Sequence, residues 1–256
     1  MIIKELRAAR WAAIAGVVVI ALSVVTLLTT NLHHITLQDL TNQSDSDFGA
    51  VTSGHISTLS ATIWLAFFSD NILYLLVGLV SVLLGARLLA SEAGSGSILL
   101  LLSRPISRER ILFTKYSVCA LLLLALCCLC GVGALVFGAA AGEAQPIGGV
   151  LLSTLLLWLA TLCVLGVTLV YSVLFPSSLA AGGSGFLTVY LLSLAPLFHI
   201  HTPSIPGGPE WSLPTYWSNL SIYAGATNPA QSIVVAGIAA LIPPLIALFL
   251  FRRKAY

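Results

Sequence analysis

The chain has 256 residues, of which 58% are hydrophobic and 8% are charged, and its formal net charge is +2 at pH 7. A mean hydropathy of +1.03 excludes an ordinary soluble domain, because such a domain needs far more polar surface to cover its core. The apolar runs are continuous rather than alternating, which excludes the pattern of a transmembrane β-barrel. The composition therefore predicts an all-α polytopic membrane protein, for which we expect no nucleic-acid partner.

Six apolar runs come close to the length of about 18 to 25 residues that crosses a hydrocarbon layer of about 30 Å. We expect transmembrane helices at Trp11–Thr29, Ile72–Leu89, Tyr116–Ala139, Ile147–Phe175, Ala180–Phe198 and Ile233–Phe251. The fourth run is long enough to require a tilt or a start before the membrane. Residues 1–256 are thus predicted to form a single transmembrane domain. All five cysteines lie inside apolar runs, where thiols usually act as small hydrophobic side chains.

The charged residues predict the orientation of these spans. With six spans, all 11 lysines and arginines fall on one side of the membrane, and the loops on the other side carry acidic residues as their only charges. The side rich in lysine and arginine is normally the cytoplasmic one. We therefore expect both termini and the loop of residues 90–115 in the cytoplasm, and the loop of residues 200–232 outside.

The first ten residues have the pattern of an amphipathic helix. Lys4, Arg7 and Arg10 fall on one helical face, and Ile2 and Leu6 fall on the opposite face. This pattern predicts a helix that lies in the membrane surface, with its basic side toward anionic lipid headgroups. The alternative is that the three basic residues only flank an extended first span.

The 90–115 loop combines features that topology alone does not require. Gly94 and Gly96 permit a tight turn after the second span, and the apolar block Ile98–Leu102 is too short to span. The Ser103-Arg104-Pro105 sequence should stop a helix, because proline disfavours helical geometry in the residue before it. Ser107 is then placed to cap a new helix. We expect a helix, a break and a second helix at the cytoplasmic surface.

The charges of this loop have two interpretations. The segment contains Arg104, Arg108, Arg110 and Lys115, and we expect its exposed face to be basic. These residues either serve topology alone or dock a cytoplasmic partner, for which the planar fork of arginine is suited because it binds carboxylates with two hydrogen bonds.

The same segment resembles the cytoplasmic loop of ABC-2 type transporter permeases. That loop carries a glutamate, glycines, a Leu-Leu-Ser-x-Pro-x-Ser-Arg-like block and a lysine at the start of the third span. The matching residues here are Glu92, Gly94, Gly96, Leu101, Leu102, Ser103, Pro105, Ser107, Arg108 and Lys115. The resemblance extends to the number of spans, the amphipathic N-terminal segment and the length of the chain.

The resemblance implies a partnership with separate ATP-binding-cassette ATPases. Two permease chains, expected to be a homodimer, and two ATPase subunits would form a transporter, by family default an exporter in a bacterial plasma membrane. The resemblance assigns coupling to the ATPase to Glu92, Gly94, Gly96, Arg104, Pro105 and Arg108. ATP and Mg²⁺ would bind to the partner, because this sequence has no G-x-x-x-x-G-K-[ST] phosphate loop. We therefore expect no enzymatic activity in this chain.

In the family, the translocation path lies between the two copies and is lined mainly by the second and fifth spans. The polar candidates for this path are Asn71, Ser81, Ser184 and Thr188. The small residues around them have the alternative role of close helix packing. No charged residue lies in mid-span, which argues against a proton-coupled carrier.

Prolines and aromatic residues in the 200–232 loop predict short re-entrant or surface helices. His33, His34, His199 and His201 fall on the outer side and are weak candidates for a metal site.

Two other functions stay open. One is a non-transporting membrane scaffold or immunity subunit. The other is an intramembrane serine protease that uses Ser184, although His199 lies 15 residues further along the same span and so about 22 Å away. The cargo is open among peptides, drugs, lipids, polysaccharides, ions and metal-related factors, as is the choice between homodimer and heterodimer.

Overall fold

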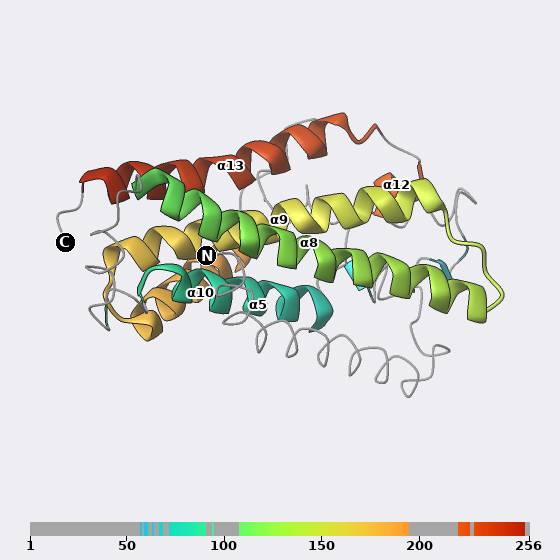
Figure 1. The fold of residues 1–256 in the computed structure, drawn as a ribbon. Coiled ribbons are helices and arrows are strands. Elements are labelled where there is room, and N and C mark those ends of the chain that lie inside the picture. The colour runs from blue at the N-terminus through green and yellow to red at the C-terminus, as the bar shows by residue number, and fades with distance from the viewer. Residues whose placement is uncertain are drawn as a thin grey trace.

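The computed structural model describes residues 57, 59–60, 63, 67–68, 72–90, 94, 108–194, 220–225 and 228–253. Within these residues the chain is helical and has no strand (Figure 1). The helices are α5 (Ile72–Leu88), α8 (Arg108–Ala140), α9 (Ile147–Leu174), α10 (Ser178–Leu194), α12 (Leu220–Tyr223) and α13 (Ala230–Arg253). The predicted surface helix and first span lie outside the described residues.

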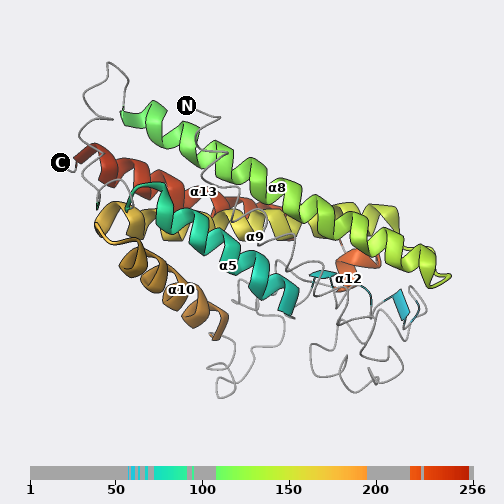
Figure 2. The ribbon, with the colours of Figure 1, turned by 60° about the horizontal axis from the view of Figure 1, so that its bottom comes forward.

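The helix α9 forms the centre of the bundle, because it packs against each of the other described helices. The two views show α13 on one side of α9 and α5 and α10 on the other side (Figures 1 and 2). The predicted fourth span, Ile147–Phe175, therefore corresponds to the most surrounded helix of the described bundle.

Three described helices are long and apolar enough to cross a membrane: Glu109–Ala140, Ile147–Leu174 and Ala230–Arg253. The helices α5 and α10 have 17 residues each. The described chain thus confirms an all-helical protein with membrane-spanning helices, and the count of six spans stays a prediction.

The helix α8 is longer than a single span requires. Its 33 residues extend over about 50 Å at a rise of about 1.5 Å per residue. The predicted second helix of the loop, after Ser107, and the predicted third span are therefore one continuous helix. Its first turns extend beyond a hydrocarbon layer of about 30 Å.

Large apolar side chains cover the outer faces of the bundle. On α8 and α13 the exposed ones include Leu121, Leu129, Val132, Val136, Val234, Ile238, Leu241, Leu245 and Phe249. Contiguous apolar surface on this scale is unfavourable in water, whereas lipid chains cover it without cost. The outer faces are therefore those of a protein embedded in a bilayer.

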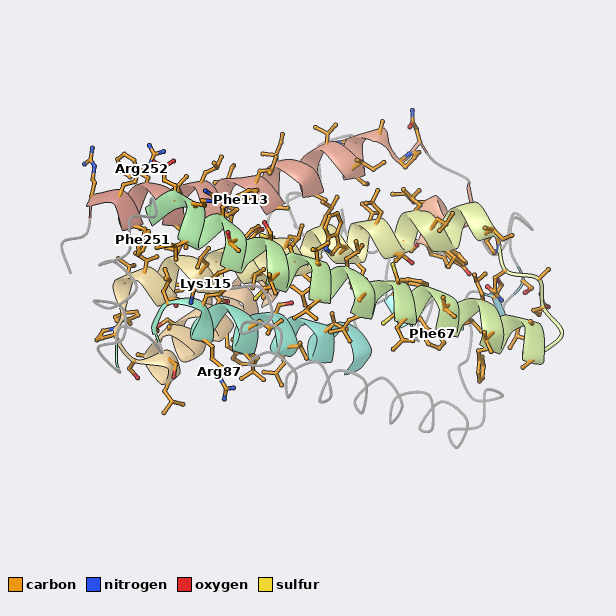
Figure 3. The ribbon with its side chains drawn as sticks, in the orientation of Figure 1. Phe67, Arg87, Phe113, Lys115, Phe251 and Arg252 are labelled. Atoms are coloured by element: carbon orange, nitrogen blue, oxygen red, sulfur yellow. The ribbon has the colours of Figure 1, made fainter. Side chains whose placement is uncertain are left out.

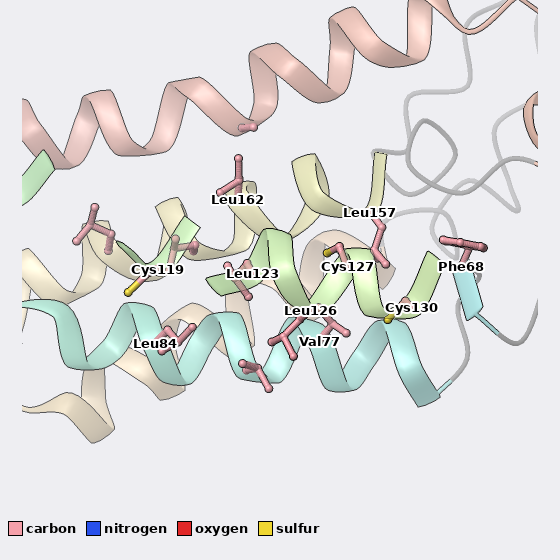
Figure 4. Packing of buried hydrophobic residues seen from close by; sticks show 14 of the residues in the cluster. Phe68, Val77, Leu84, Cys119, Leu123, Leu126, Cys127, Cys130, Leu157 and Leu162 are labelled. Atoms are coloured by element: carbon pink, nitrogen blue, oxygen red, sulfur yellow. The ribbon is translucent and has the colours of Figure 1, made fainter. Parts of the chain in front are cut away.

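The buried face of α8 packs against α5 through a mixed cluster of leucine, valine and cysteine side chains. Figure 4 shows Cys119, Cys127 and Cys130 among residues that include Leu84 and Val77. All five cysteines are free thiols, and Cys128 is the exposed one. The buried thiols contact apolar neighbours, as small hydrophobic side chains do.

Small residues bring α5, α9 and α10 close together. A Cβ atom on Gly85 would lie 2.8 Å from Cβ of Thr168, and a Cβ atom on Gly185 would lie 2.8 Å from Oγ1 of the same threonine. Thr168 is fully buried, and its hydroxyl donates a hydrogen bond to the Val164 carbonyl. Two glycines from different helices thus enclose one threonine of α9.

We expect Gly185→Ala to destabilise the protein by about 1–3 kcal/mol, because the new methyl group must displace a buried, β-branched side chain. The matched control is Gly183→Ala on the same helix, where no atom lies within 4 Å of the added carbon. Thermal unfolding of the detergent-solubilised protein measures both effects. Equal melting temperatures for the two variants would contradict the close packing.

The end of the bundle at the α8–α9 turn holds a buried polar cluster. The side-chain oxygen of Gln145 accepts hydrogen bonds from Ser60 Oγ, at 2.7 Å, and from the Tyr223 hydroxyl. Burial raises the pKa of Tyr223 to about 12, so its hydroxyl keeps its proton at neutral pH. The cluster attaches α12 and the segment before α5 to the α8–α9 turn.

Two contacts between segments distant in the sequence agree with the predicted topology. Ser60, Gln145 and Tyr223 were all assigned to the outer side, and they lie together at one end of the bundle. Glu109 and Arg252 were both assigned to the cytoplasmic side, and they form an ion pair at the other end. Each of these two contacts therefore joins segments that are predicted to lie on the same side of the membrane, while the number of spans and their orientation stay predictions.

Cysteine labelling tests the orientation itself. We expect a membrane-impermeant maleimide to label Glu143→Cys in intact cells and to label Arg253→Cys only after the membrane is permeabilised. The unmodified chain is the control for its own five cysteines. The reverse labelling pattern would show that the termini lie outside.

Candidate functional site

Every lysine and arginine of the described residues lies at one end of the bundle. These residues are Arg87, Arg108, Arg110, Lys115, Arg252 and Arg253. Figure 3 shows Arg87, Lys115 and Arg252 at this end and Phe67 far from it. We call this end, formed by residues 87–90, 94, 108–115, 172–178 and 249–253, the charged end.

The helix α5 stops abruptly at the charged end. It ends at Leu88, the chain bends at Leu89, and Ala90 is helical again. The backbone N–H groups of Leu89 and Ala90 donate hydrogen bonds to Ser172 Oγ of α9, at 3.1 and 2.9 Å. The same hydroxyl donates to the Ala86 carbonyl, at 3.4 Å. A side chain of another helix therefore satisfies the amides that an uninterrupted α5 would bond internally.

Lys115 of α8 also contacts the end of α5. Its Nζ donates a hydrogen bond to the Leu88 carbonyl oxygen, at 3.0 Å, and the residue is only 2% exposed. Lys115 therefore does not contribute to an exposed basic face, because the lysine turns into the bundle to meet a helix C-terminus. A carbonyl at a helix C-terminus carries partial negative charge and suits a cationic side chain.

The start of the predicted coupling segment lies against the α9–α10 turn. Gly94 is helical and exposed, and a Cβ atom on it would lie 2.8 Å from the Pro176 carbonyl oxygen. The Pro176-Ser177-Ser178 turn was assigned to the same side of the membrane as the 90–115 loop. Glycine is required at residue 94 because the backbone of the turn leaves no room for a side chain.

An ion pair joins the first turn of α8 to the last turn of α13. Arg252 Nη2 and Glu109 Oε1 are 2.7 Å apart, and both side chains are about half exposed. The Arg253 guanidinium lies 4.2 Å from the centre of the Phe249 ring, and Phe251 is fully buried beside them. Exposed pairs of this kind contribute at most about 1 kcal/mol. At the charged end, α13 thus combines a half-exposed ion pair with the buried side chain of Phe251.

The structure describes only part of the predicted coupling set. Gly94 has the contact given above, and Arg108 is the first residue of α8. Glu92, Gly96, Arg104 and Pro105 lie outside the described residues, as do Lys4, Arg7 and Arg10 of the predicted surface helix. Their roles in coupling and membrane binding stay predictions.

The polar candidates for the translocation path have partners within the bundle. The Ser81 hydroxyl donates to the Val77 carbonyl of its own helix and is fully buried. Thr188 donates to the carbonyl of half-buried Ser184 and shares a 2.8 Å hydrogen bond with the Tyr171 hydroxyl. Asn71 lies outside the described residues.

In the described part of the chain, no group of three or more histidine, cysteine, aspartate or glutamate residues is arranged to hold a metal ion. The weak candidates His33, His34, His199 and His201 lie outside that part.

Ser172 is the residue that sequence reasoning missed. It stands near the end of a nearly continuous apolar run, where a serine is usually a neutral packing residue. The available signal was its position three residues before Phe175 and four before Pro176, at the predicted cytoplasmic end of the span. That position places Ser172 at the charged end of the bundle, but it does not indicate which groups Ser172 binds.

Comparison with known families gives a match that covers nearly the whole chain. The model of the family described as "ABC-2 family transporter protein" matches residues 2–255. A search of individual curated proteins found no match. The family match includes every described helix and the segments between them, so it does not rest on the 90–115 loop alone.

Proposed function

We propose, from the premise that the chain belongs to the ABC-2 family of transporter proteins, that it is the membrane permease subunit of an ATP-driven exporter. Members of this family are membrane components of transporters and associate with the ATPase components of ABC transporters. In the proposed complex, two copies of this chain form the translocation path in a bacterial plasma membrane. Two separate ATPase subunits bind ATP and Mg²⁺ and dock on the 92–108 segment.

The construction of the charged end is the observation that supports docking at this place. Three connections meet there: the base of the 90–115 loop, the α9–α10 turn and the end of α13. A force applied to the loop therefore acts on the ends of α5, α8 and α9 at once. Rigid-body rearrangement of packed helices is a common way in which such a force changes a protein between two states.

The alternative functions have less support from the described residues. A scaffold subunit would have the same spans, but it would not need a loop whose base is held by two other helices. A protease would need a base beside the Ser184 hydroxyl, and the described hydrogen bond of that residue is the one that its backbone carbonyl accepts from Thr188. The candidate base, His199, lies outside the described residues.

Affinity purification of the tagged full-length chain from its native membrane tests the proposal. We expect an ATP-binding-cassette ATPase to co-purify in mild detergent at about equal stoichiometry, as identified and quantified by mass spectrometry. The complex should hydrolyse ATP in the presence of Mg²⁺. Reproducible isolation of the folded chain without such an ATPase would reject the coupling function and favour a scaffold.

A further inference from the structure

The strongest unassigned feature of the molecule is the way in which the break at the end of α5 is held. In a continuous helix, the N–H groups of Leu89 and Ala90 would donate to the carbonyls of residues 85 and 86. Here both donate to Ser172 Oγ of α9, more than 80 residues away in the sequence. Among the described contacts, a side chain from another helix therefore holds the bend.

A second contact joins the two ends of the 90–115 loop. Lys115 Nζ reaches the Leu88 carbonyl across 27 residues of sequence. Lysine is almost never fully buried unless it is paired, because burial removes water from its charge. The hydrogen bond to the Leu88 carbonyl therefore gives Lys115 a partner in its buried position. We call the hydrogen bonds of Ser172 to Leu89 and Ala90, together with that of Lys115 to Leu88, the clasp.

The bend that the clasp holds lies directly before the predicted docking segment in the sequence. Gly94, four residues after Ala90, lies against the Pro176 carbonyl of the α9–α10 turn. Ser172 lies one turn before that proline on α9. The described start of the loop is therefore connected to α8 through Lys115, to α9 through Ser172 and to the start of α10 through the turn.

We propose that Ser172 and Lys115 are positioning residues that make the 90–115 loop and the ends of α5, α8 and α9 move as one unit. This inference rests on the proposed function, since it concerns how a movement of the loop is passed on. Without the clasp, the loop bends about Leu89 and the helices do not follow it. With the clasp, closure of the ATPase pair displaces α9 and, through the turn at Pro176, the start of α10.

Four substitutions distinguish this positioning role from a role in stability alone. Ser172→Ala removes the acceptor of both amides, and Lys115→Met removes the donor while keeping an unbranched apolar stem. Ser172→Thr keeps the oxygen and should restore behaviour close to wild type. The matched control is Thr154→Val, because Thr154 is a buried residue of the same helix whose hydroxyl bonds only the Val150 carbonyl one turn before it, among the contacts described.

Hydrogen exchange of the purified complex in lipid nanodiscs provides the measurement, with ATP, Mg²⁺ and vanadate used to hold the ATPase pair closed. In the resting complex, Ser172→Ala should raise exchange at Leu89 and Ala90 about tenfold, because their buried amides lose their acceptor. On closure, wild type and Thr154→Val should change in the loop and in the 174–180 segment. Ser172→Ala and Lys115→Met should keep the change in the loop and lose about nine-tenths of it at 174–180.

Two results would overturn the inference, and they are distinguishable. If the wild-type loop does not respond to closure, the proposed coupling function fails and the clasp has no role in it. If the wild-type loop responds and the change reaches 174–180 equally in Ser172→Ala and Lys115→Met, the coupling function stands and the inference alone is wrong. Basal ATPase activity and melting temperature, measured on the same samples, exclude loss of assembly as the cause of a reduced response.

Discussion

Reversal of Arg104 and Arg108 to glutamate is expected to release the ATPase from the chain while the membrane helices stay folded. If the 92–108 segment docks in an acidic groove, each arginine makes charge-assisted hydrogen bonds to a carboxylate, and each glutamate replaces attraction by repulsion. We expect the affinity for the ATPase to fall by about a hundredfold or more, since truncation of one interfacial charge partner already costs about 2–5 kcal/mol. Co-purification and ATPase rate measure this loss.

The matched control carries the same change of charge elsewhere at the charged end. In Arg252→Glu with Arg253→Glu, two arginines of α13 are reversed, and the half-exposed ion pair to Glu109 is lost. That loss should cost no more than about 1 kcal/mol. If the control releases the ATPase as readily as the loop variant does, net charge rather than the loop governs docking.

Gly149→Ala is expected to be the most destabilising single methyl addition at the opposite end of the bundle. A Cβ atom there would overlap the backbone carbonyl oxygen of Tyr223, so α12 or α9 must shift. A backbone atom cannot change rotamer to make room, and overpacking of this kind costs about 1–3 kcal/mol or more. The shift would also pull the Tyr223 hydroxyl away from Gln145.

The neighbouring Gly148 is the control for this variant. A Cβ atom at Gly148 has no atom within 4 Å, and alanine is a better helix former than glycine by about 1 kcal/mol. Gly148→Ala should therefore leave the melting temperature unchanged or raise it, whereas Gly149→Ala lowers it. A decrease of the same size in both variants would show that the tight contact with α12 is absent.

Much of the helical layout follows from local sequence properties. The fourth predicted span begins at Ile147, as α9 does, and ends one residue after it, because the Gln-Pro sequence before Ile147 and the Pro-Ser-Ser sequence after Phe175 interrupt helices at both ends. The predicted sixth span is contained within α13. The prediction of a new helix after Ser107 matches the start of α8 at Arg108. The helix signals in these regions are strong and lie within a few residues of the boundary.

The candidate site was only partly accessible to the same reasoning. The clustering of charges and the glycine spacing point to the 90–115 loop, whose role in coupling stays a prediction. The burial of Lys115 was not accessible to that reasoning, since a lysine near a membrane surface is normally expected to reach water. Its burial depends on the position of the Leu88 carbonyl, which residues near Lys115 in the sequence do not reveal.

By itself, the sequence determined that this is a helical membrane protein, where several of its helices begin and end, and on which side each loop is expected. These properties depend on composition, on charge and on neighbours within a few residues. Only the tertiary structure decided that α9 is central, that Gly149 rather than Gly148 meets another backbone, and that Ser172 and Lys115 hold the end of α5. The physical reason is that each of these depends on atoms brought together from distant parts of the chain, where packing and hydrogen-bond geometry leave no local pattern.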